Sequence, residues 1–200
     1  MKVSEVFESI QGEGRYTGES VLFIRLSGCT RACSFCDTKY HSKGKEISVK
    51  TLTKRIKKIK AKTVVWTGGE PALQFKEITE VIVKTPEICH HLETNGDLII
   101  NYYYFNYVCF SPKELKVAKN VYTFCNTYLN QELYDIKIVT DLEKVNLDLV
   151  PFATTLMPLT TYDKEKDLEI KKRVWEYCLK NKLHYSPRLQ VDLYDKKRGI

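Results

Sequence analysis

The segment CTRACSFCDT, residues 29–38, constrains this chain more than any other stretch. Its cysteines, Cys29, Cys33 and Cys36, follow the spacing C-x3-C-x2-C. A structural zinc site takes four ligands, and a ferredoxin-type cluster takes a cysteine for each of its four irons. Three cysteines would therefore leave one cluster iron open to a small molecule. The alternative interpretation is a loop that carries three reduced structural thiols.

Length and composition indicate a globular chain of single-domain size. Its 200 residues, 43% of them hydrophobic, suit one sizeable core better than two, which predicts a single domain over residues 1–200. The cysteine count of 7 is odd and no apolar leader opens the chain, so we expect reduced thiols in a cytoplasmic protein. The apolar runs have strand length, so we expect no membrane span.

The formal charge of +7 raises the possibility of a nucleic-acid partner. The basic residues concentrate in the segment 50–62, where Leu52, Ile56 and Ile59 recur at helical spacing between lysines. This pattern favours a solvated helix face, and we do not expect direct nucleic-acid binding. The scattered thiols Cys89, Cys109, Cys125 and Cys178 are predicted to be buried and inert, and His90 and His91 to be structural.

The rest of the chain alternates strand-like and helix-like segments. Arg25 interrupts a strand-like apolar run and needs an anionic partner, either a protein carboxylate or a carboxylated substrate. Pro71 can open a helix that carries Phe75, Ile78 and Val81. We predict a mostly parallel sheet of about six strands, an open, truncated (β/α) partial barrel, because a complete barrel takes about 250 residues. The predicted strands are 21–27, 63–66, 88–93, 102–110, 133–139, 152–156 and 189–193, and a long helix is predicted over 163–180.

Two motifs together resemble the radical S-adenosylmethionine (SAM) enzymes. The cysteine spacing, with Phe35 before the third cysteine, resembles the signature of that superfamily, and TGGEP at residues 67–71 resembles its GGE segment. The resemblance implies a 4Fe-4S cluster whose open iron is chelated by the amino acid end of SAM. It also implies a site at the carboxyl ends of the strands, where parallel α/β proteins build their sites.

Further stretches resemble the 7-carboxy-7-deazaguanine synthases. They are SIQGEGRYTGES at 9–20, Arg25, CDT at 36–38, SPK at 111–113 and the closing SPRLQVDLYDKKRGI at 186–200. The resemblance implies radical ring contraction of 6-carboxy-5,6,7,8-tetrahydropterin to 7-carboxy-7-deazaguanine with loss of ammonia, on the route to 7-deazapurine nucleosides such as queuosine. It further implies SAM, a 4Fe-4S cluster and Mg2+ as cofactors, an electron donor such as flavodoxin, and a homodimer.

Residue by residue, the resemblance assigns three groups of positions. Cluster and metal positions are Cys29, Cys33 and Cys36 for the 4Fe-4S cluster and Thr38 for Mg2+. Positions that contact SAM are Phe35, Cys36, Asp37, Gly68, Gly69, Glu70, Ser111, Pro112, Lys113, Met157 and Pro158. Substrate positions are Ile10, Gln11, Gly12, Arg25, Thr67 and Ile200, the last through its terminal carboxylate.

Two other functions use part of the same pattern. An activase that makes a glycyl radical on a partner enzyme would share the cysteines and GGEP but would not require QGEG, Arg25 or CDT. A non-catalytic metal-binding nucleic-acid module would bind zinc and would not cleave SAM. Iron and sulfide analysis after anaerobic reconstitution separates the second alternative from a radical SAM enzyme.

Overall fold

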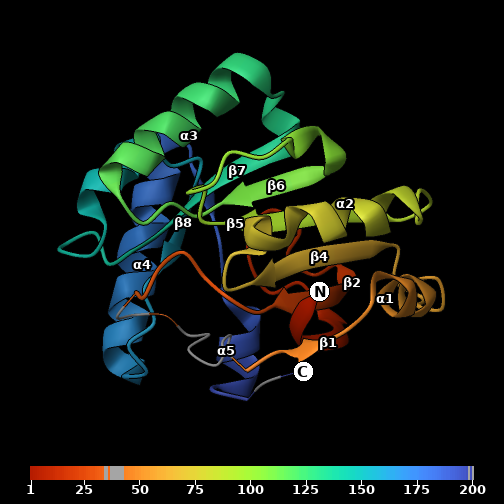
Figure 1. The fold of residues 1–200 in the computed structure, drawn as a ribbon. Helices are drawn as coiled ribbons and strands as arrows, with labels where there is room; N and C mark the ends of the chain where they lie inside the picture. Colours follow the sequence, from red (N-terminus) through yellow and green to blue (C-terminus); the bar gives the residue numbers. More distant parts are fainter. Residues whose placement is uncertain (34–35, 37–42, 198, 200) are drawn as a thin grey trace. The chain divides into compact units, whose positions relative to one another are not determined.

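The structure, a computed structural model, describes residues 1–33, 36, 43–197 and 199. The chain divides into two compact units. Unit 1 contains Met1–Ile10 and Ser20–Val108, and unit 2 contains Gln11–Glu19 and Cys109–Arg198. The positions of these parts relative to one another are not determined, so each unit is described by itself (Figure 1).

Unit 1 is built on a sheet whose central strands are apolar on both faces. Val21, Leu22 and Ile24 of β2 are buried, as are Val64 and Trp66 of β4. Strands β2, β4 and β5 are parallel, whereas β1 runs antiparallel to β2 and β3. In order across the sheet, the strands are β3 (Lys45–Glu46), β1 (Lys2–Ile10), β2 (Ser20–Leu26), β4 (Thr63–Gly68) and β5 (Cys89–Thr94).

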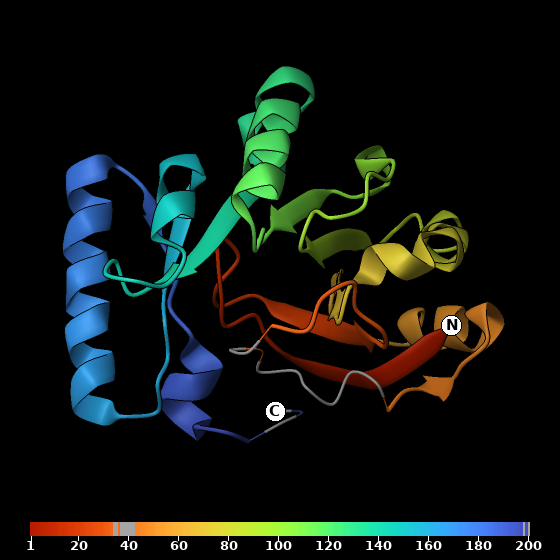
Figure 2. The ribbon, with the colours of Figure 1, turned by 60° about the vertical axis from the view of Figure 1, so that its left-hand side comes forward.

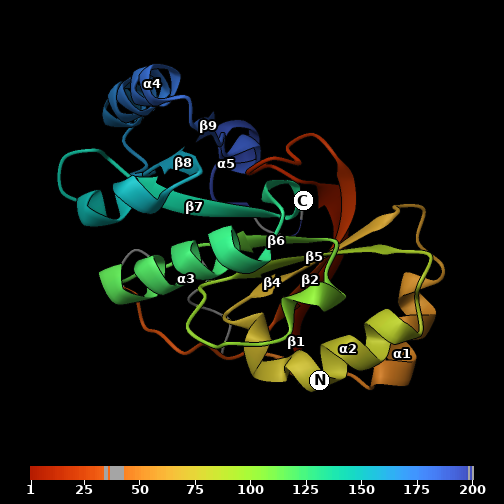
Figure 3. The ribbon, with the colours of Figure 1, turned by 90° about the horizontal axis from the view of Figure 1, so that it is seen from above.

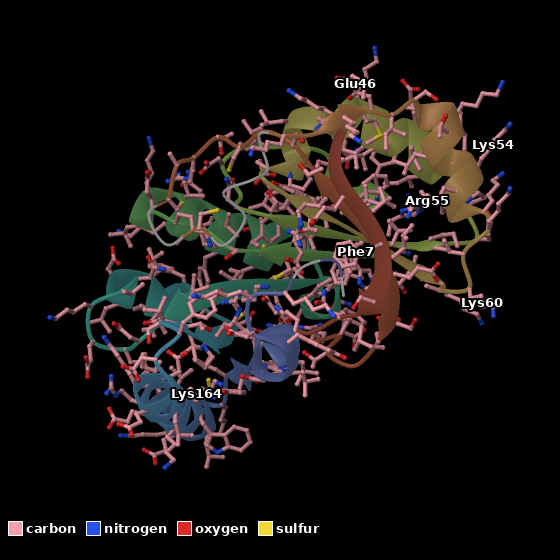
Figure 4. All side chains as sticks on the ribbon, turned by 90° about the horizontal axis from the view of Figure 1, so that it is seen from below. Phe7, Glu46, Lys54, Arg55, Lys60 and Lys164 are labelled. Carbon is pink, nitrogen blue, oxygen red and sulfur yellow. The ribbon has the colours of Figure 1, made fainter. Side chains whose placement is uncertain are left out.

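Two α-helices of unit 1 lie side by side, as Figures 1 and 3 show. Helix α1 (Val49–Ile56) begins at Ser48, whose hydroxyl accepts from the Thr51 amide at 3.1 Å. It buries Leu52 and Ile56, whereas its basic residues are exposed: Lys54 extends into solvent and Arg55 donates to the Val6 carbonyl (Figure 4). The solvated helix face is thus confirmed, although the helix is shorter than the basic segment. The turn η1 (Pro71–Gln74) leads into α2 (Phe75–Val83), and η2 spans Tyr102–Tyr104.

Unit 2 contains three parallel strands with helices packed along them. The strands are β7 (Tyr134–Thr140), β8 (Thr155–Pro158) and β9 (His184–Tyr185). Helix α4 (Lys164–Asn181) lies along β8 and buries Ile170, Val174 and Cys178 (Figure 2). The other elements are α3 (Leu115–Tyr128), η3 (Gln131–Leu133), η4 (Leu147–Phe152) and α5 (Leu189–Tyr194). Strand β6 (Tyr107–Phe110) contains the division between the units.

Several predictions about elements were wrong. Residues 189–193 form helix α5, not a strand, and the strand predicted over 102–110 begins only at Tyr107, after a 3-10 turn. The strand predicted over 152–156 is Thr155–Pro158. The described residues contain nine strands instead of about six, because short strands such as β3 and β9 carry little apolar pattern.

The predictions for scattered side chains were mostly right. Cys109, Cys125 and Cys178 are buried, but Cys89 is exposed at the start of β5, so the prediction of a buried thiol there was wrong. His90 and His91 are buried, and Trp66 donates from Nε1 to Nδ1 of His90 at 3.1 Å. Among the helices of the described residues, none is both long and apolar enough to cross a bilayer.

Candidate active site

The three motif cysteines lie in a loop that leaves the carboxyl end of β2. We call the described residues of this loop, 28–33 and Cys36, the cysteine loop. Cys29, Cys33 and Cys36 are half-buried free thiols. The Arg31 amide donates to the Cys29 sulfur at 3.4 Å, and the Cys36 amide donates to the Cys33 carbonyl at 3.2 Å. Three accessible thiols within one short loop fit the donor set of a cluster with an open iron.

The surroundings of Cys29 favour its protonated form. Burial is the main cause of its raised pKa, a hydrogen bond from Arg31 opposes it, and Glu70, Cys33 and Cys36 raise it further. Among the residues that the structure describes, no three His, Cys, Asp or Glu side chains already stand in metal-binding geometry. Thiols must lose their protons when they bind metal, so cluster binding at these cysteines would be coupled to proton release.

The TGGEP turn packs on the start of the cysteine loop, backbone against backbone. The Gly69 amide donates to the Leu26 carbonyl at 3.1 Å, and the Glu70 amide donates to the Gly28 carbonyl at 2.8 Å. A Cβ at Gly69 would collide with the Gly28 carbonyl oxygen, and Gly68 has a φ of 131°. Both glycines are therefore required by the approach of the two segments, a reason that the sequence did not reveal.

The Glu70 side chain turns into the protein. Its carboxylate accepts from the amides of Ala72 at 2.9 Å and Asn95 at 2.7 Å, and from the Thr94 hydroxyl at 2.7 Å. Burial raises the pKa of Glu70, and these hydrogen bonds oppose that shift. Glu70 is fully buried, so its carboxylate acts as a structural anchor of the turn.

The substrate positions Arg25 and Thr67 are neighbours on adjacent strands. Arg25 on β2 is in register with Thr67 on β4 and with Glu5 on β1. Residues in register point to the same face of a sheet, so the three side chains form one row. The Arg25 Nε donates to a Glu5 carboxylate oxygen at 2.9 Å. The structure therefore supplies the protein carboxylate that the sequence left as one of two possible partners for Arg25.

The loop Gln11–Glu19 belongs to unit 2, although the strands that flank it belong to unit 1. The Gly12 carbonyl accepts from the Leu189 amide at 3.1 Å, and the Gly14 amide donates to the Ser186 hydroxyl at 2.8 Å. A Cβ at Gly12 would collide with the Gln190 side chain. The backbone of this loop is thus fitted to the closing segment of the chain.

Glu13 is the ionic centre of this loop. Its carboxylate accepts from Lys137 Nζ at 2.8 Å, Arg188 Nε at 3.2 Å and Gln190 Nε2 at 2.7 Å. The two cations lower the pKa of Glu13 far below its usual range, although burial opposes them. Two residues on, Arg15 pairs with buried Asp135 at 2.8 Å. Charged contacts of opposite sign therefore attach the loop to β7 and the closing segment.

The remaining SAM positions of unit 2 lie at strand ends. Ser111, Pro112 and Lys113 follow β6, and Lys113 Nζ donates to the Ser111 hydroxyl at 2.7 Å. Met157 and Pro158 are buried at the end of β8, not in the loop after it. Strand ends are where α/β proteins place ligands, and the role of these positions in SAM binding stays a prediction.

The other predicted site residues divide as follows. Ile10 ends β1 in unit 1, next to Gln11 in the chain. Phe35, Asp37, Thr38 and Ile200 lie outside the described residues. Within unit 1 the structure brings the start of the cysteine loop to the GGE turn and places Arg25 beside Thr67, and within unit 2 it brings Gly12 to the closing segment.

Sequence reasoning missed the charged partners in both units. Arg31 and Asp97 form an ion pair beside Cys29, and Lys137 pairs with Glu13. One signal was present for Lys137, because it interrupts the apolar strand YDIKIVT just as Arg25 interrupts its own strand. Nothing in the sequence pattern links Arg31 to Asp97.

Comparison with known proteins agrees with this geometry. Residues 23–117 match the Radical SAM superfamily. A 7-carboxy-7-deazaguanine synthase of Hyperthermus butylicus is 31% identical, over 96% of this chain and 92% of that protein. One of Thermoplasma acidophilum is 36% identical, over 72% of this chain and 73% of that protein.

A solved structure supports the fold. The crystal structure of QueE from Escherichia coli matches with a TM-score of 0.58 at 19% identity, over 92% of both chains. The chain therefore has the open α/β partial-barrel fold predicted from its sequence. The two synthases named above match most of the chain at more than 30% identity. The chain belongs to the 7-carboxy-7-deazaguanine synthase family of radical SAM enzymes.

Proposed function

We propose that this chain converts 6-carboxy-5,6,7,8-tetrahydropterin to 7-carboxy-7-deazaguanine with release of ammonia. The observation that carries the proposal is the packing of the cysteine loop on the GGE turn, beside paired strands that present Arg25 and Thr67. This arrangement joins a cluster motif to a cation suited to a carboxylated substrate. The names of the relatives supply the product, 7-carboxy-7-deazaguanine.

The residues divide the work by their chemistry. Cys29, Cys33 and Cys36 hold a 4Fe-4S cluster, which together with SAM supplies radical chemistry when bound. The family resemblance supports Gly68 and Gly69 of unit 1, and Ser111–Lys113 of unit 2, as positions that contact SAM. Arg25, held by Glu5, binds the substrate carboxylate, and Gln11 and Gly12 orient the pterin ring through polar backbone groups.

Magnesium belongs to the proposal as well. We assign Thr38 as its protein ligand, because Mg2+ usually keeps several waters and takes other oxygens from its substrate. Replacement of Thr38 by alanine should leave iron content unchanged but weaken the stimulation of turnover by Mg2+. A magnesium response equal to that of the original protein would remove Thr38 from the site.

The proposal extends to the setting of the enzyme. We propose that the chain forms a single radical SAM domain over residues 1–200 and works as a homodimer in the cytoplasm. A donor such as flavodoxin would supply the electron that reduces the cluster. The terminal carboxylate at Ile200 is proposed as a further substrate contact. The substrate is a small molecule, so no direct nucleic-acid contact is needed.

Anaerobic reconstitution tests the central proposal. The protein should take up about four irons and four sulfides. After reduction it should consume 6-carboxytetrahydropterin only when SAM is present, and mass spectrometry should identify 7-carboxy-7-deazaguanine as the product. A colourless protein with one zinc would indicate a metal-binding module instead. SAM cleavage that never consumes the pterin would favour an activase.

A further inference from the structure

The segment Thr94–Asp97 follows β5 and has no role in the reaction described above. Its Gly96 has a φ of 75°, which favours glycine, and two internal bonds fix its shape. The Gly96 amide donates to the Thr94 hydroxyl at 3.1 Å, and the Asp97 amide donates to the Asn95 side-chain oxygen at 2.9 Å. The segment is therefore a rigid turn with polar groups directed to both sides.

One side of this turn holds the GGE turn. The Thr94 hydroxyl donates to one carboxylate oxygen of Glu70, and the Asn95 amide donates to the other, both at 2.7 Å. Thr94, Asn95 and Glu70 are all buried. Hydrogen bonds to a buried carboxylate are among the stronger ones in proteins, so this attachment is firm.

The other side holds the cysteine loop. Asp97 accepts from Arg31 Nε at 2.6 Å and from Arg31 Nη2 at 2.5 Å, which is a two-bond, fork-like pair. The Thr30 hydroxyl donates to Asp97 at 2.7 Å, and Asn95 Nδ2 donates to Thr30 at 2.8 Å. The Arg31 and Asp97 side chains are 17% and 13% exposed, so water weakens the pair little.

These contacts fall between the first and second cluster ligands. Thr30 and Arg31 directly follow Cys29 and precede Cys33. We propose that Thr94–Asp97 is a bracket that fixes the cysteine loop against the GGE turn before the cluster binds, with Asp97 and Arg31 as its positioning residues. The inference rests on the cluster and SAM part of the proposed function and is independent of the pterin substrate.

The physical reason is conformational entropy. A loop that must order itself as it binds metal loses part of the binding free energy to ordering. The bracket restricts the loop beforehand, since Arg31 and Asp97 are separated by 66 residues and their pairing closes the loop onto β5. A contact that served only the fold of the turn would not change the mobility of the cysteines.

Hydrogen exchange in the metal-free protein tests the bracket. In Asp97→Asn, amides of residues 29–33 should exchange about tenfold faster or more, because the charge-assisted pair is lost. Arg31→Lys should show a similar change, because lysine keeps the charge but cannot form the paired bonds. Iron retained after reconstitution and gel filtration should fall in both variants.

Asp141→Asn is the matched control. The Asp141 carboxylate in unit 2 accepts from the amides of Glu143, Lys144 and Val145, so its loss also removes a structural carboxylate. It should leave exchange at 29–33 and iron content unchanged. The double variant Arg31→Ala/Asp97→Ala should be no worse than Asp97→Ala if the two residues act as one unit.

Three results would overturn the bracket. They are unchanged exchange at 29–33 in Asp97→Asn, equal loosening in Asp141→Asn, or additive losses in the double variant. Because these measurements use metal-free protein without substrate, they remain decisive if the pterin reaction fails. Conversely, a protein that loads iron normally but does not consume the pterin would reject only the proposed substrate.

Discussion

Cys29 lies at a position suited to a cluster ligand, although its surroundings favour the protonated thiol over the thiolate that binds iron. Burial and nearby acidic groups raise the pKa of its thiol, yet the spacing to Cys33 and Cys36 matches a three-thiolate cluster. The surroundings of Cys29 therefore favour the thiol over the thiolate that a cluster iron would bind. None of the three cysteines can be spared, because each would be the protein ligand of one cluster iron.

Replacing any one of these cysteines by alanine should abolish SAM cleavage. Cys29→Ala, Cys33→Ala and Cys36→Ala should each lose the cluster absorbance and reduce SAM cleavage to background. Cys89→Ala is the appropriate control, since Cys89 is exposed and its loss leaves no cavity. Iron, sulfide and 5′-deoxyadenosine are measured together. Wild-type cleavage in any of the first three variants would reject the cluster assignment.

Arg25 illustrates a residue with a protein partner and a proposed ligand. Arg25→Ala should raise the KM for the carboxylated pterin about 10- to 100-fold, because a charge-assisted bond to a carboxylate is worth roughly 1.5 to 3 kcal/mol. Glu5→Gln should raise the KM less, since Arg25 then keeps its charge but loses the carboxylate that positions its guanidinium. Steady-state kinetics at saturating SAM provide the measurement.

Arg55→Ala is the control for a lost guanidinium. Arg55 donates to the Val6 carbonyl at 2.6 Å from the exposed face of α1. Its replacement should leave the KM unchanged. If Arg25→Ala lowers only the melting temperature and the KM stays at its original value, Arg25 is a structural partner of Glu5.

At the scale of elements, strong periodic patterns were predictable and short ones were not. The strand predicted over 21–27 and the helix predicted over 163–180 correspond closely to β2 and α4, because long apolar runs and long helical periods are unambiguous. The segment 189–193 alternates apolar and polar residues over too few positions to separate a strand from one helical turn. Its helical state places Gln190 beside Gly12 and Glu13.

The loop Gln11–Glu19 was recognised through the family resemblance of SIQGEGRYTGES, but its anchors were not. Glu13 and Lys137 are 124 residues apart in sequence, and no local pattern reports such a contact. The loop could be recognised because this stretch, with its glycines, forms a distinctive local pattern. Only the fold showed that Glu13 pairs with Lys137.

Glu13→Gln should weaken substrate binding through the loop. The substitution leaves Lys137 and Arg188 side by side without their carboxylate, which should cost roughly 3 to 5 kcal/mol of stability. Because Gly12 lies next to Glu13, we expect the KM for the pterin to rise severalfold at temperatures where the variant is folded. Iron content should remain unchanged, since the cysteines lie in unit 1.

The control for this charge removal is Glu143→Gln. Glu143 pairs with Arg173 at 2.6 Å but is 57% exposed, so its loss should cost less than about 1 kcal/mol. Kinetics and chemical denaturation are compared for both variants. A Glu13→Gln protein that is less stable but keeps the original KM would limit Glu13 to a structural role.

For the whole molecule, the fold class followed from the order of strands and helices, whereas the division into two compact units did not. Titratable side chains buried inside unit 1 also affect its stability in a way that composition does not reveal. The clearest case is the pair His90 and His91. The pKa of each is lowered from 6.5 to about 4, mainly by burial, and for His91 the neighbouring His90 contributes to that shift.

These depressed pKa values should make unfolding depend on pH. Below pH 6.5 the unfolded chain binds protons that the folded histidines refuse, so stability is complete above pH 6.5 and falls as pH approaches 4. Each histidine should contribute a loss of roughly 2 to 3 kcal/mol across that window. His90 accepts from Trp66 through Nδ1, so its protonation would also break a buried bond.

His90→Gln separates the contribution of His90 to the pH dependence of stability from that of carboxylates, which titrate in the same pH range. Glutamine does not titrate, so the variant should lose less stability between pH 7 and 4.5 than the original protein, although it is less stable at pH 7. His184→Gln, at an exposed position on β9, should preserve the original slope. Urea unfolding followed by tryptophan fluorescence at several pH values measures both. If the slope is the same in all three proteins, His90 does not carry the pH dependence of folding.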